Sequence, residues 1–142
     1  MQRLLRKFES AKQYLPQPVL HKAAQTTRFG AIYFGSTGAA MEETLVALAA
    51  QGIYLDTLRL RSFPFHDEVA DFIAEREQVF VVEQNRDAQM RMLLANELAV
   101  DAAKLIPVLH YDGTPITARF IIREMSEKLA LFNVTPLRKV AP

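Results

Sequence analysis

The sequence predicts an α/β fold, with an open, mostly parallel β-sheet of four to five strands flanked by helices. Short apolar runs rich in β-branched and aromatic residues recur along the chain, and each is followed by a segment of helical periodicity. The run Val79–Val82 lacks polar alternation, which is typical of a strand covered on both faces. Half of the 142 residues are hydrophobic, enough for the core of one domain.

The elements follow one another as alternating strands and helices. The predicted strands are Phe29–Phe34, Ile53–Leu60, Val79–Val82 and Lys104–His110. The predicted helices are Ala39–Gln51, Asp67–Glu75, Asp87–Ala99 and Thr117–Leu131. Gly52 is placed to end the first of these helices in a left-handed conformation, and Pro107 cannot donate to a sheet, which predicts an edge or a bulge. The alternation favours right-handed crossovers between parallel strands.

The first 28 residues differ from the rest. Met1–Leu15 predicts an amphipathic helix with basic residues between its apolar ones, and the prolines that follow break it. Such a helix suits a membrane surface, an organelle-targeting segment or an arm that packs on a neighbouring domain, and we favour the arm. We therefore divide the chain into an arm and linker (1–28), a sheet domain (29–131) and a C-terminal tail (132–142).

Composition narrows the classes of function. A net charge of +1 argues against nucleic acid as a partner. Without cysteine, the chain has no disulfide, no thiolate nucleophile and no Cys-ligated iron–sulfur cluster, and we expect a cytoplasmic protein. No apolar run approaches the roughly 20 residues that cross a bilayer, so no membrane partner is expected. His21, His66 and His110 are scattered, and no metal site is predicted.

The turn Gly35–Gly38 lies between a predicted strand and a predicted helix. Backbone N–H groups at such a turn can hold an anion, which makes Gly35, Ser36, Thr37 and Gly38 weak candidates for cofactor binding. The spacing is neither that of a dinucleotide-binding fingerprint nor that of a P-loop. The alternative, which we favour, is that Ser36 and Thr37 cap the helix.

Polar residues end the third predicted strand. Glu83, Gln84 and Asn85 lie where parallel strands usually build ligand or partner sites. A carboxylate there can act as a general base, but it has no adjacent histidine or second carboxylate to tune it. We therefore predict a structural or interface role, with Arg59 and Arg61 placed to meet Glu83, and assign no catalytic residue.

Two segments of the sequence resemble a known family. Leu58–Asn85, with the sequence LRLRSFPFHDEVADFIAEREQVFVVEQN, resembles the transketolase C-terminal-like domain, as does Ile32–Ile53. Gln89 and Tyr111–Thr117 are most similar to the C-terminal end of the α subunit of 2-oxoacid:ferredoxin oxidoreductases, in particular the 2-oxoglutarate type. Arg3–Ala11 resembles the segment that enters this domain there. The resemblance extends to about Leu129.

This resemblance implies a part in a larger enzyme. The whole enzyme uses thiamine diphosphate, Mg²⁺, coenzyme A and [4Fe–4S] clusters to oxidise a 2-oxoacid to acyl-CoA and CO₂ and to reduce ferredoxin. Its thiamine site is built from other domains of the α and β subunits. We therefore expect a non-catalytic domain that holds no cofactor alone. Its expected partners are N-terminal domains of the same subunit, the β subunit, ferredoxin through the complex, and further copies in a homo- or hetero-oligomer.

One departure and two alternatives accompany the resemblance. The acidic linker that is usual in the family is shortened at Thr26–Gly30, which leaves the placement of neighbouring domains open. A free-standing flavodoxin-like module that binds a small molecule or nucleotide through Gly35–Gly38 is the alternative from another class. A relative of transketolase, or of the pyruvate dehydrogenase E1 β subunit, differs only in the parent enzyme.

Overall fold

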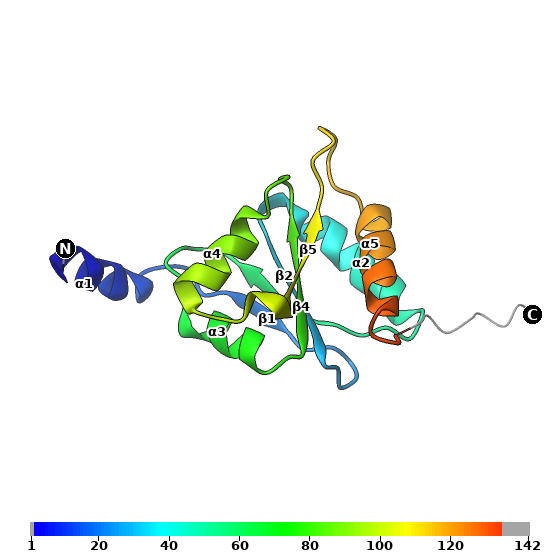
Figure 1. Cartoon of the computed structure of the whole chain (residues 1–142), viewed down its shortest axis with the longest axis horizontal. Helices are drawn as coiled ribbons and strands as arrows, with labels where there is room; N and C mark the ends of the chain where they lie inside the picture. Colours follow the sequence, from blue (N-terminus) through cyan, green and yellow to red (C-terminus); the bar gives the residue numbers. More distant parts are fainter. Residues whose placement is uncertain (1, 135–142) are drawn as a thin grey trace, which may run out of the picture.

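The computed structural model describes residues 2–134, and of residues 2–5 and 9 only the backbone. Helices cover both faces of one five-stranded sheet (Figure 1). The strands are β1 (Val19–His21), β2 (Phe29–Phe34), β3 (Asp56–Leu60), β4 (Gln78–Glu83) and β5 (Leu105–Leu109). The helices are α1 (Gln2–Lys12), α2 (Gly38–Ala49), α3 (Asp67–Ala74), α4 (Gln89–Leu98) and α5 (Ala118–Ala130), with short 3₁₀ turns η1 (Gly35–Thr37) and η2 (Ala102–Lys104). The predicted fold class is confirmed; most of the predicted tail lies outside the described residues.

The strand order is β1-β3-β2-β4-β5. Strand β2 runs parallel to β3 and β4, and β4 runs parallel to β5, whereas β1 pairs antiparallel to β3. Strands β2 and β4, both in the interior of the sheet, carry apolar runs, and Val79–Val82 of β4 is fully buried. Strand β5 lies at the edge, which agrees with Pro107. Gly52 has a φ of +77°, as a glycine that ends a helix is expected to have.

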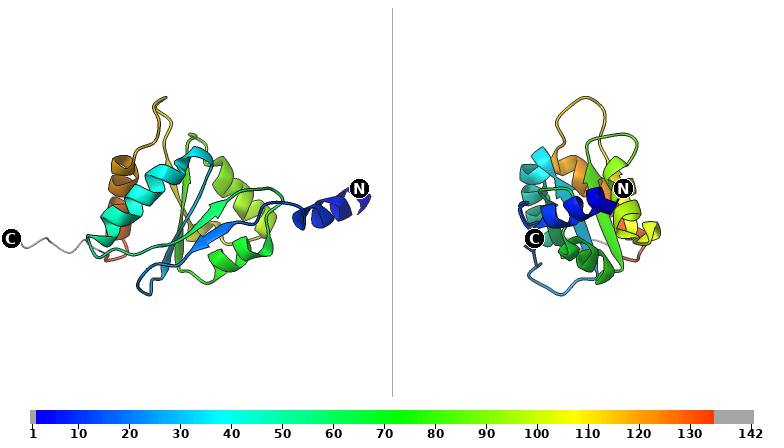
Figure 2. Two further views of the ribbon diagram at one scale, coloured as in Figure 1. Left: turned by 180° about the vertical axis from the view of Figure 1, so that it is seen from behind. Right: turned by 90° about the vertical axis from the view of Figure 1, so that its left-hand side faces the viewer.

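Two apolar layers enclose the sheet. Because successive side chains of a strand point to opposite faces, Phe80 and Val82 pack with α2 and α5, whereas Val79 and Val81 pack with α3 and α4. The back view in Figure 2 shows α2 and α5 together on one face of the sheet. The polar ends of the strands are thus left at the two rims of the sheet.

Strand β1 is the element that the sequence analysis missed. It lies inside the segment predicted as arm and linker, and Leu20 pairs with Leu58 of β3. Three residues after Pro18 are too few to show a period, and the pairing depends on a partner that is distant in sequence. Two predicted starts shift by more than one residue: β3 begins at Asp56 rather than Ile53, and α4 begins at Gln89 rather than Asp87, after Ala88 adopts a φ of +52°.

Helix α1 projects from the body of the molecule, as Figures 1 and 2 both show. At its base, Lys12 Nζ lies 3.2 Å from Asp67 Oδ1 of α3. The segment that joins α1 to β1 is held by Ser62, whose hydroxyl donates to the Pro16 carbonyl at 2.9 Å. Within residues 2–134, no helix is long and apolar enough to cross a membrane.

Gly30 tests how tightly α3 packs against β2. A Cβ at Gly30 would lie 2.7 Å from Arg76 Cδ and 2.8 Å from the Phe72 ring, both buried. We expect Gly30→Ala to lower the free energy of unfolding by about 1–3 kcal/mol in urea titrations, because overpacking forces these side chains apart. Gly38→Ala is the control, since its new Cβ would make only ordinary contacts, the nearest at 3.6 Å. Equal stability of the two variants would contradict this packing.

Candidate functional site

The loops that follow β2 and β4 meet at the carboxyl rim of the sheet. Gln84 Nε2 donates to Ser36 Oγ and to Thr37 Oγ1, each at 3.2 Å. The structure thus brings together the two segments that the sequence analysis singled out, Gly35–Gly38 and Glu83–Asn85. Ser36 and Gln84 are exposed, so this part of the rim is open to a partner.

The turn Gly35–Gly38 is shaped by its neighbours rather than by helix capping. Thr37 precedes α2 but makes no capping hydrogen bond through its side chain, and its hydroxyl accepts from Gln84 instead. The predicted capping role is therefore wrong for Thr37. Gly35 has a φ of +59°, and its carbonyl accepts a hydrogen bond from Arg59 Nη2 at 3.3 Å. The positive φ explains a glycine at this position.

The expected meeting of Arg59 and Arg61 with Glu83 does not occur. Strand β2 lies between β3, which ends next to Arg61, and β4, which ends at Glu83. Arg59 reaches only as far as Gly35, and Arg61 is exposed. The strand order decides this outcome, and the sequence alone does not contain it. Whether the two arginines contact a partner stays a prediction.

Glu83 is fully buried, and its carboxylate caps the N-terminus of α4. Its Oε2 accepts from Met90 N at 2.8 Å and from Asn85 Nδ2 at 2.7 Å, and its Oε1 accepts from Arg91 N at 3.0 Å. A carboxylate at the N-terminal end of a helix satisfies N–H groups that have no partner within the helix, and its charge is stabilised by the helix dipole. With its oxygens enclosed in this way, Glu83 is poorly placed to act as a general base. It is equally poorly placed to touch a partner directly.

Asn85 completes the same junction. Its Oδ1 accepts from Asp87 N at 3.1 Å and from Gln89 N at 3.2 Å. Beside it lies a hollow of about 420 Å³, lined by Phe34, Gln84, Asn85, Gln89, Met90 and Leu93. Amide groups and apolar side chains can hold a partner surface, but they provide no acid, base or nucleophile. This part of the rim is therefore suited to contact rather than to chemistry.

The loop that follows β5 projects beyond the rim, where Figure 1 shows it at the top. Its base is fixed by His110, which is buried against the Phe120 ring and has Nε2 3.4 Å from Asp112 Oδ1. Hydrogen bonds from Thr114 hold the pKa of Asp112 below its ordinary value. Tyr111 is 63% exposed at the side of this loop. The loop adds a braced, exposed aromatic ring to the same edge.

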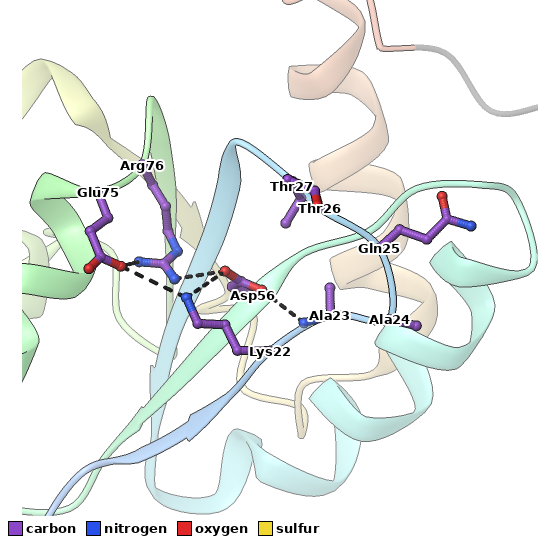
Figure 3. A pocket seen from close by; sticks show the side chains of 9 residues that line it. All are labelled: Lys22, Ala23, Ala24, Gln25, Thr26, Thr27, Asp56, Glu75 and Arg76. Carbon is purple, nitrogen blue, oxygen red and sulfur yellow. Dashed lines mark hydrogen bonds and ion pairs between the residues drawn. The ribbon is translucent and has the colours of Figure 1, made fainter.

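A second polar cluster, absent from the sequence analysis, lies at the opposite rim (Figure 3). Arg76 is buried, with Nη2 2.7 Å from Asp56 Oδ2 and its guanidinium 3.7 Å from the centre of the Phe72 ring. Asp56 also accepts from Ala23 N at 2.8 Å and lies 3.5 Å from Lys22 Nζ. Burial by itself would raise the pKa of Asp56, but the Ala23 N–H, Arg76 and Lys22 together hold it below its ordinary value.

This cluster borders a hollow of about 360 Å³ between the β1–β2 loop and the end of α3. Lys22 and Arg76 are matched by Asp56 and Glu75, so their charges compensate one another. The arrangement joins three segments of the chain and leaves no unmatched charge for a ligand. One signal in the sequence pointed to it: an aspartate inside the apolar run Ile53–Leu60 requires a buried partner.

The described residues contain no group of three His, Asp or Glu side chains that could hold a metal ion. The three histidines occupy different places in the fold: His21 is exposed on β1, His66 is buried at the start of α3, and His110 is buried after β5. The geometry thus offers two polar rims, one braced by ion pairs and one by amides and hydroxyls, without a catalytic constellation at either.

Comparisons with known proteins relate this fold to oxidoreductases. No protein-family model matches the chain, and neither does any curated protein. A solved 2-oxoglutarate:ferredoxin oxidoreductase from Magnetococcus marinus, with 2-oxoglutarate, coenzyme A and succinyl-CoA bound, is similar with a TM-score of 0.74 at 22% identity. The match covers 85% of this chain and 21% of that one.

A second solved structure is similar over almost its whole length. It is the alpha chain of a probable 2-oxoacid ferredoxin oxidoreductase from Thermoplasma acidophilum, with a TM-score of 0.54 at 24% identity. The match covers 80% of this chain and 97% of that one. At these identities the likeness shows a shared fold: this chain has the architecture of one part of such an oxidoreductase, about a fifth of the Magnetococcus chain.

Replacement of Glu83 tests the capping of α4. Glu83→Gln puts an amide NH₂ where a carboxylate oxygen now accepts hydrogen bonds, so at least one buried N–H loses its acceptor. We expect the free energy of unfolding to fall by about 2–3 kcal/mol. The amide protons of Met90 and Arg91 should also exchange faster. Glu97→Gln, an exposed change on the same helix, is the control and should leave both measurements unaltered.

Replacement of Asp56 tests the ion pair at the opposite rim. Asp56→Asn leaves the buried Arg76 with only the exposed Glu75 carboxylate as an ionic partner and should lower the free energy of unfolding at pH 7 by about 3 kcal/mol. Because the pKa of Asp56 is lowered by folding, its contribution is complete above the unfolded pKa, about 3.9, and is lost as the pH falls through the lower folded pKa. The free energies of unfolding of the wild type and the variant should therefore become equal as the pH falls into the acid range.

The control for this pair is Glu77→Gln, which removes an exposed ion pair with Arg28. It should change the free energy of unfolding by less than about 1 kcal/mol. If the free energies of unfolding of the wild type and Asp56→Asn differed by the same amount from pH 7 down to the pH of acid unfolding, the assigned role of the Asp56 carboxylate would be contradicted.

Proposed function

We propose that this chain is a non-catalytic assembly domain of a 2-oxoacid:ferredoxin oxidoreductase. It would correspond to the C-terminal, transketolase C-terminal-like domain of the α subunit. In the whole enzyme, a 2-oxoacid and coenzyme A would become acyl-CoA and CO₂ while ferredoxin is reduced. The observation that carries the proposal is the fold likeness, at a TM-score of 0.74 over 85% of the chain, to an enzyme solved with 2-oxoglutarate and coenzyme A bound.

The chemistry of the carboxyl rim supports an assembly role. Glu83, the carboxylate nearest to that edge along β4, already accepts hydrogen bonds from backbone N–H groups in the first turn of α4. The exposed groups beside it include the Ser36 hydroxyl and the Gln84 amide, which bond to each other. Such neutral groups, next to an apolar hollow, are typical of contact surfaces between domains. Arg59, Arg61 and Asn85 would extend the same interface.

The cofactors of the whole enzyme would be held by other segments. Iron–sulfur clusters are held by cysteine, which this chain lacks, and the described residues do not group into a site for Mg²⁺. The described residues therefore offer no ligand set for Mg²⁺ and the sequence offers none for a [4Fe–4S] cluster, and we propose that thiamine diphosphate, Mg²⁺ and the clusters belong to the rest of the α subunit and to the β subunit. We likewise propose 2-oxoglutarate as the substrate of the whole enzyme and the cytoplasm as its location.

A flavodoxin-like binding module remains the competing proposal. It would use Gly35–Gly38 to hold a phosphate. The hydroxyls of Ser36 and Thr37, however, already accept from Gln84, and the carbonyl of Gly35 accepts from Arg59. These contacts tie the loop to its neighbours, and its glycine spacing matches neither a dinucleotide-binding fingerprint nor a P-loop. We therefore rank this function second.

Reconstitution tests the assembly proposal. The purified chain is mixed with the remaining α-subunit domains and the β subunit of a 2-oxoacid:ferredoxin oxidoreductase from the same organism. We expect a stable complex that reduces ferredoxin when 2-oxoglutarate and coenzyme A are present, whereas the chain alone should be inactive. Gln84→Arg, which brings a charge and extra bulk to the rim, should weaken assembly at least about tenfold, or 1.4 kcal/mol.

Asn96→Arg is the matched control, since it adds the same charge at an exposed position near the other end of α4. It should assemble like the wild type. Turnover by the chain alone would defeat the proposal. So would tight binding of a flavin or a nucleotide in calorimetric titrations, which would favour the binding module instead.

A further inference from the structure

Helix α1 presents an exposed, basic and partly apolar surface. Its eleven residues include four basic side chains and one acidic side chain. Arg6 and Lys7 are exposed, and Phe8 keeps 43% of its surface exposed, a large fraction for an aromatic ring in a helix. In Figures 1 and 2 the helix extends away from the sheet and its covering helices. In one copy of the chain, the outer turns of α1 therefore lie clear of the rest of the fold.

The hinge between α1 and β1 keeps the helix in this position. Pro16 and Pro18 restrict the hinge backbone, and Ser62 Oγ holds the Pro16 carbonyl. Lys12, in the last turn of α1, contacts Asp67 of α3. From this contact towards its N-terminus, α1 extends away from the body of the molecule. Eleven helical residues extend about 16 Å, and Arg6 and Lys7 lie about 8–9 Å along the helix from Lys12.

The outer face of α3 carries the opposite charge. Asp67, Glu68 and Asp71 are exposed, and Glu68 and Asp71 form no ion pair with any side chain described in the structure. A hollow of about 400 Å³ lies between these acids and the foot of α1, bounded by Lys12, Gln13, His66, Asp67, Glu68 and Asp71. We refer to Asp67, Glu68 and Asp71 as the acidic face. It is a surface that a basic helix fits, and among the described side chains the chain's own α1 reaches it only through Lys12, which contacts Asp67.

From these observations we propose that α1 docks on the acidic face of a second copy of this chain, and that the second copy does the same in return. Each chain carries both halves of the contact, one basic arm and one acidic face. In a reciprocal exchange about a two-fold axis, each basic arm contacts the acidic face of the other chain, so that both arms and both acidic faces are occupied. The proline-containing hinge favours exchange over folding back, because folding back would require the segment before β1 to reverse its direction.

The two kinds of contact have different tasks. Each exposed ion pair contributes little affinity alone, but several in two reciprocal contacts add up, and they select the orientation in which a helix docks. The apolar residues of the arm, with Phe8 the largest of those whose side chains are described, would supply the buried area. The inference depends only on α1, its hinge and α3, and it holds whether or not the chain belongs to an oxidoreductase.

Disulfide trapping tests the exchange directly, because the chain contains no cysteine of its own. One sample of the full chain carries Lys7→Cys and another carries Asp71→Cys. We expect a covalent dimer after mild oxidation of the mixture, and much less of it from either variant alone. In a chain with both substitutions, a bond within one molecule would overturn the proposal, since α1 would then be covering its own α3.

Charge reversal and its rescue provide the second test. The wild type should be a dimer in light scattering at low salt and should become at least tenfold weaker as a dimer in 1 M NaCl, where charges are screened. Arg6→Glu with Lys7→Glu should give a monomer, and adding Glu68→Lys with Asp71→Lys should restore the dimer. Glu42→Lys with Glu43→Lys, exposed on α2, is the control and should leave the dimer intact. A monomeric wild type, or a dimer that ignores the reversal, would overturn the exchange.

Discussion

The buried ion pair between Asp56 and Arg76 is the contact on which the rest of the structure depends. It joins the start of β3 to the second residue after α3, and Asp56 also accepts a hydrogen bond from the N–H of Ala23 after β1. Gly30 leaves the space in which Arg76 and the Phe72 ring lie against β2. Three segments distant in sequence thus meet at one rim. A buried pair of this kind is costly to break from one side, because the remaining charge stays in the protein without a partner.

The two rims of the sheet consequently have different characters. Matched charges fix the amino rim, whereas amides and hydroxyls fix the carboxyl rim. Glu83, the buried carboxylate at the carboxyl rim, is used to start α4, and Gln84 ties the turn after β2 to the turn after β4. What remains exposed there is a mixture of neutral groups and surface charges, among them Gln84, Tyr111 and the ion pair between Arg86 and Asp87. This division explains why an edge that usually houses chemistry in α/β folds is better suited here to hold another protein segment.

Local patterns were sufficient for most of the helices and strands, but not for which strands lie next to one another in the sheet. The apolar run Val79–Val82, the stop at Gly52 and the edge position of Pro107 each follow from the residues concerned and were predicted correctly. Strand β1 was missed because three residues have no period. The expected contact of Arg59 with Glu83 failed because strand order is a property of the assembled sheet. The pair of Asp56 and Arg76 was missed for the same reason, although a carboxylate within an apolar strand signals a partner somewhere.

The amino rim also governs where the arm points. Asp56 holds Ala23, two residues after β1, and the pairing of Val19 through His21 with β3 continues the same constraint towards Pro18. Ser62, just beyond β3, then donates a hydrogen bond to the Pro16 carbonyl. The chain is therefore held both before and after the short strand β1. The direction of α1 is thus set by contacts that begin at a buried carboxylate about forty residues away along the chain. Protonation of Asp56 would weaken one of the three contacts that hold β1 and the hinge, so acid should affect both the stability of the fold and the proposed exchange of α1.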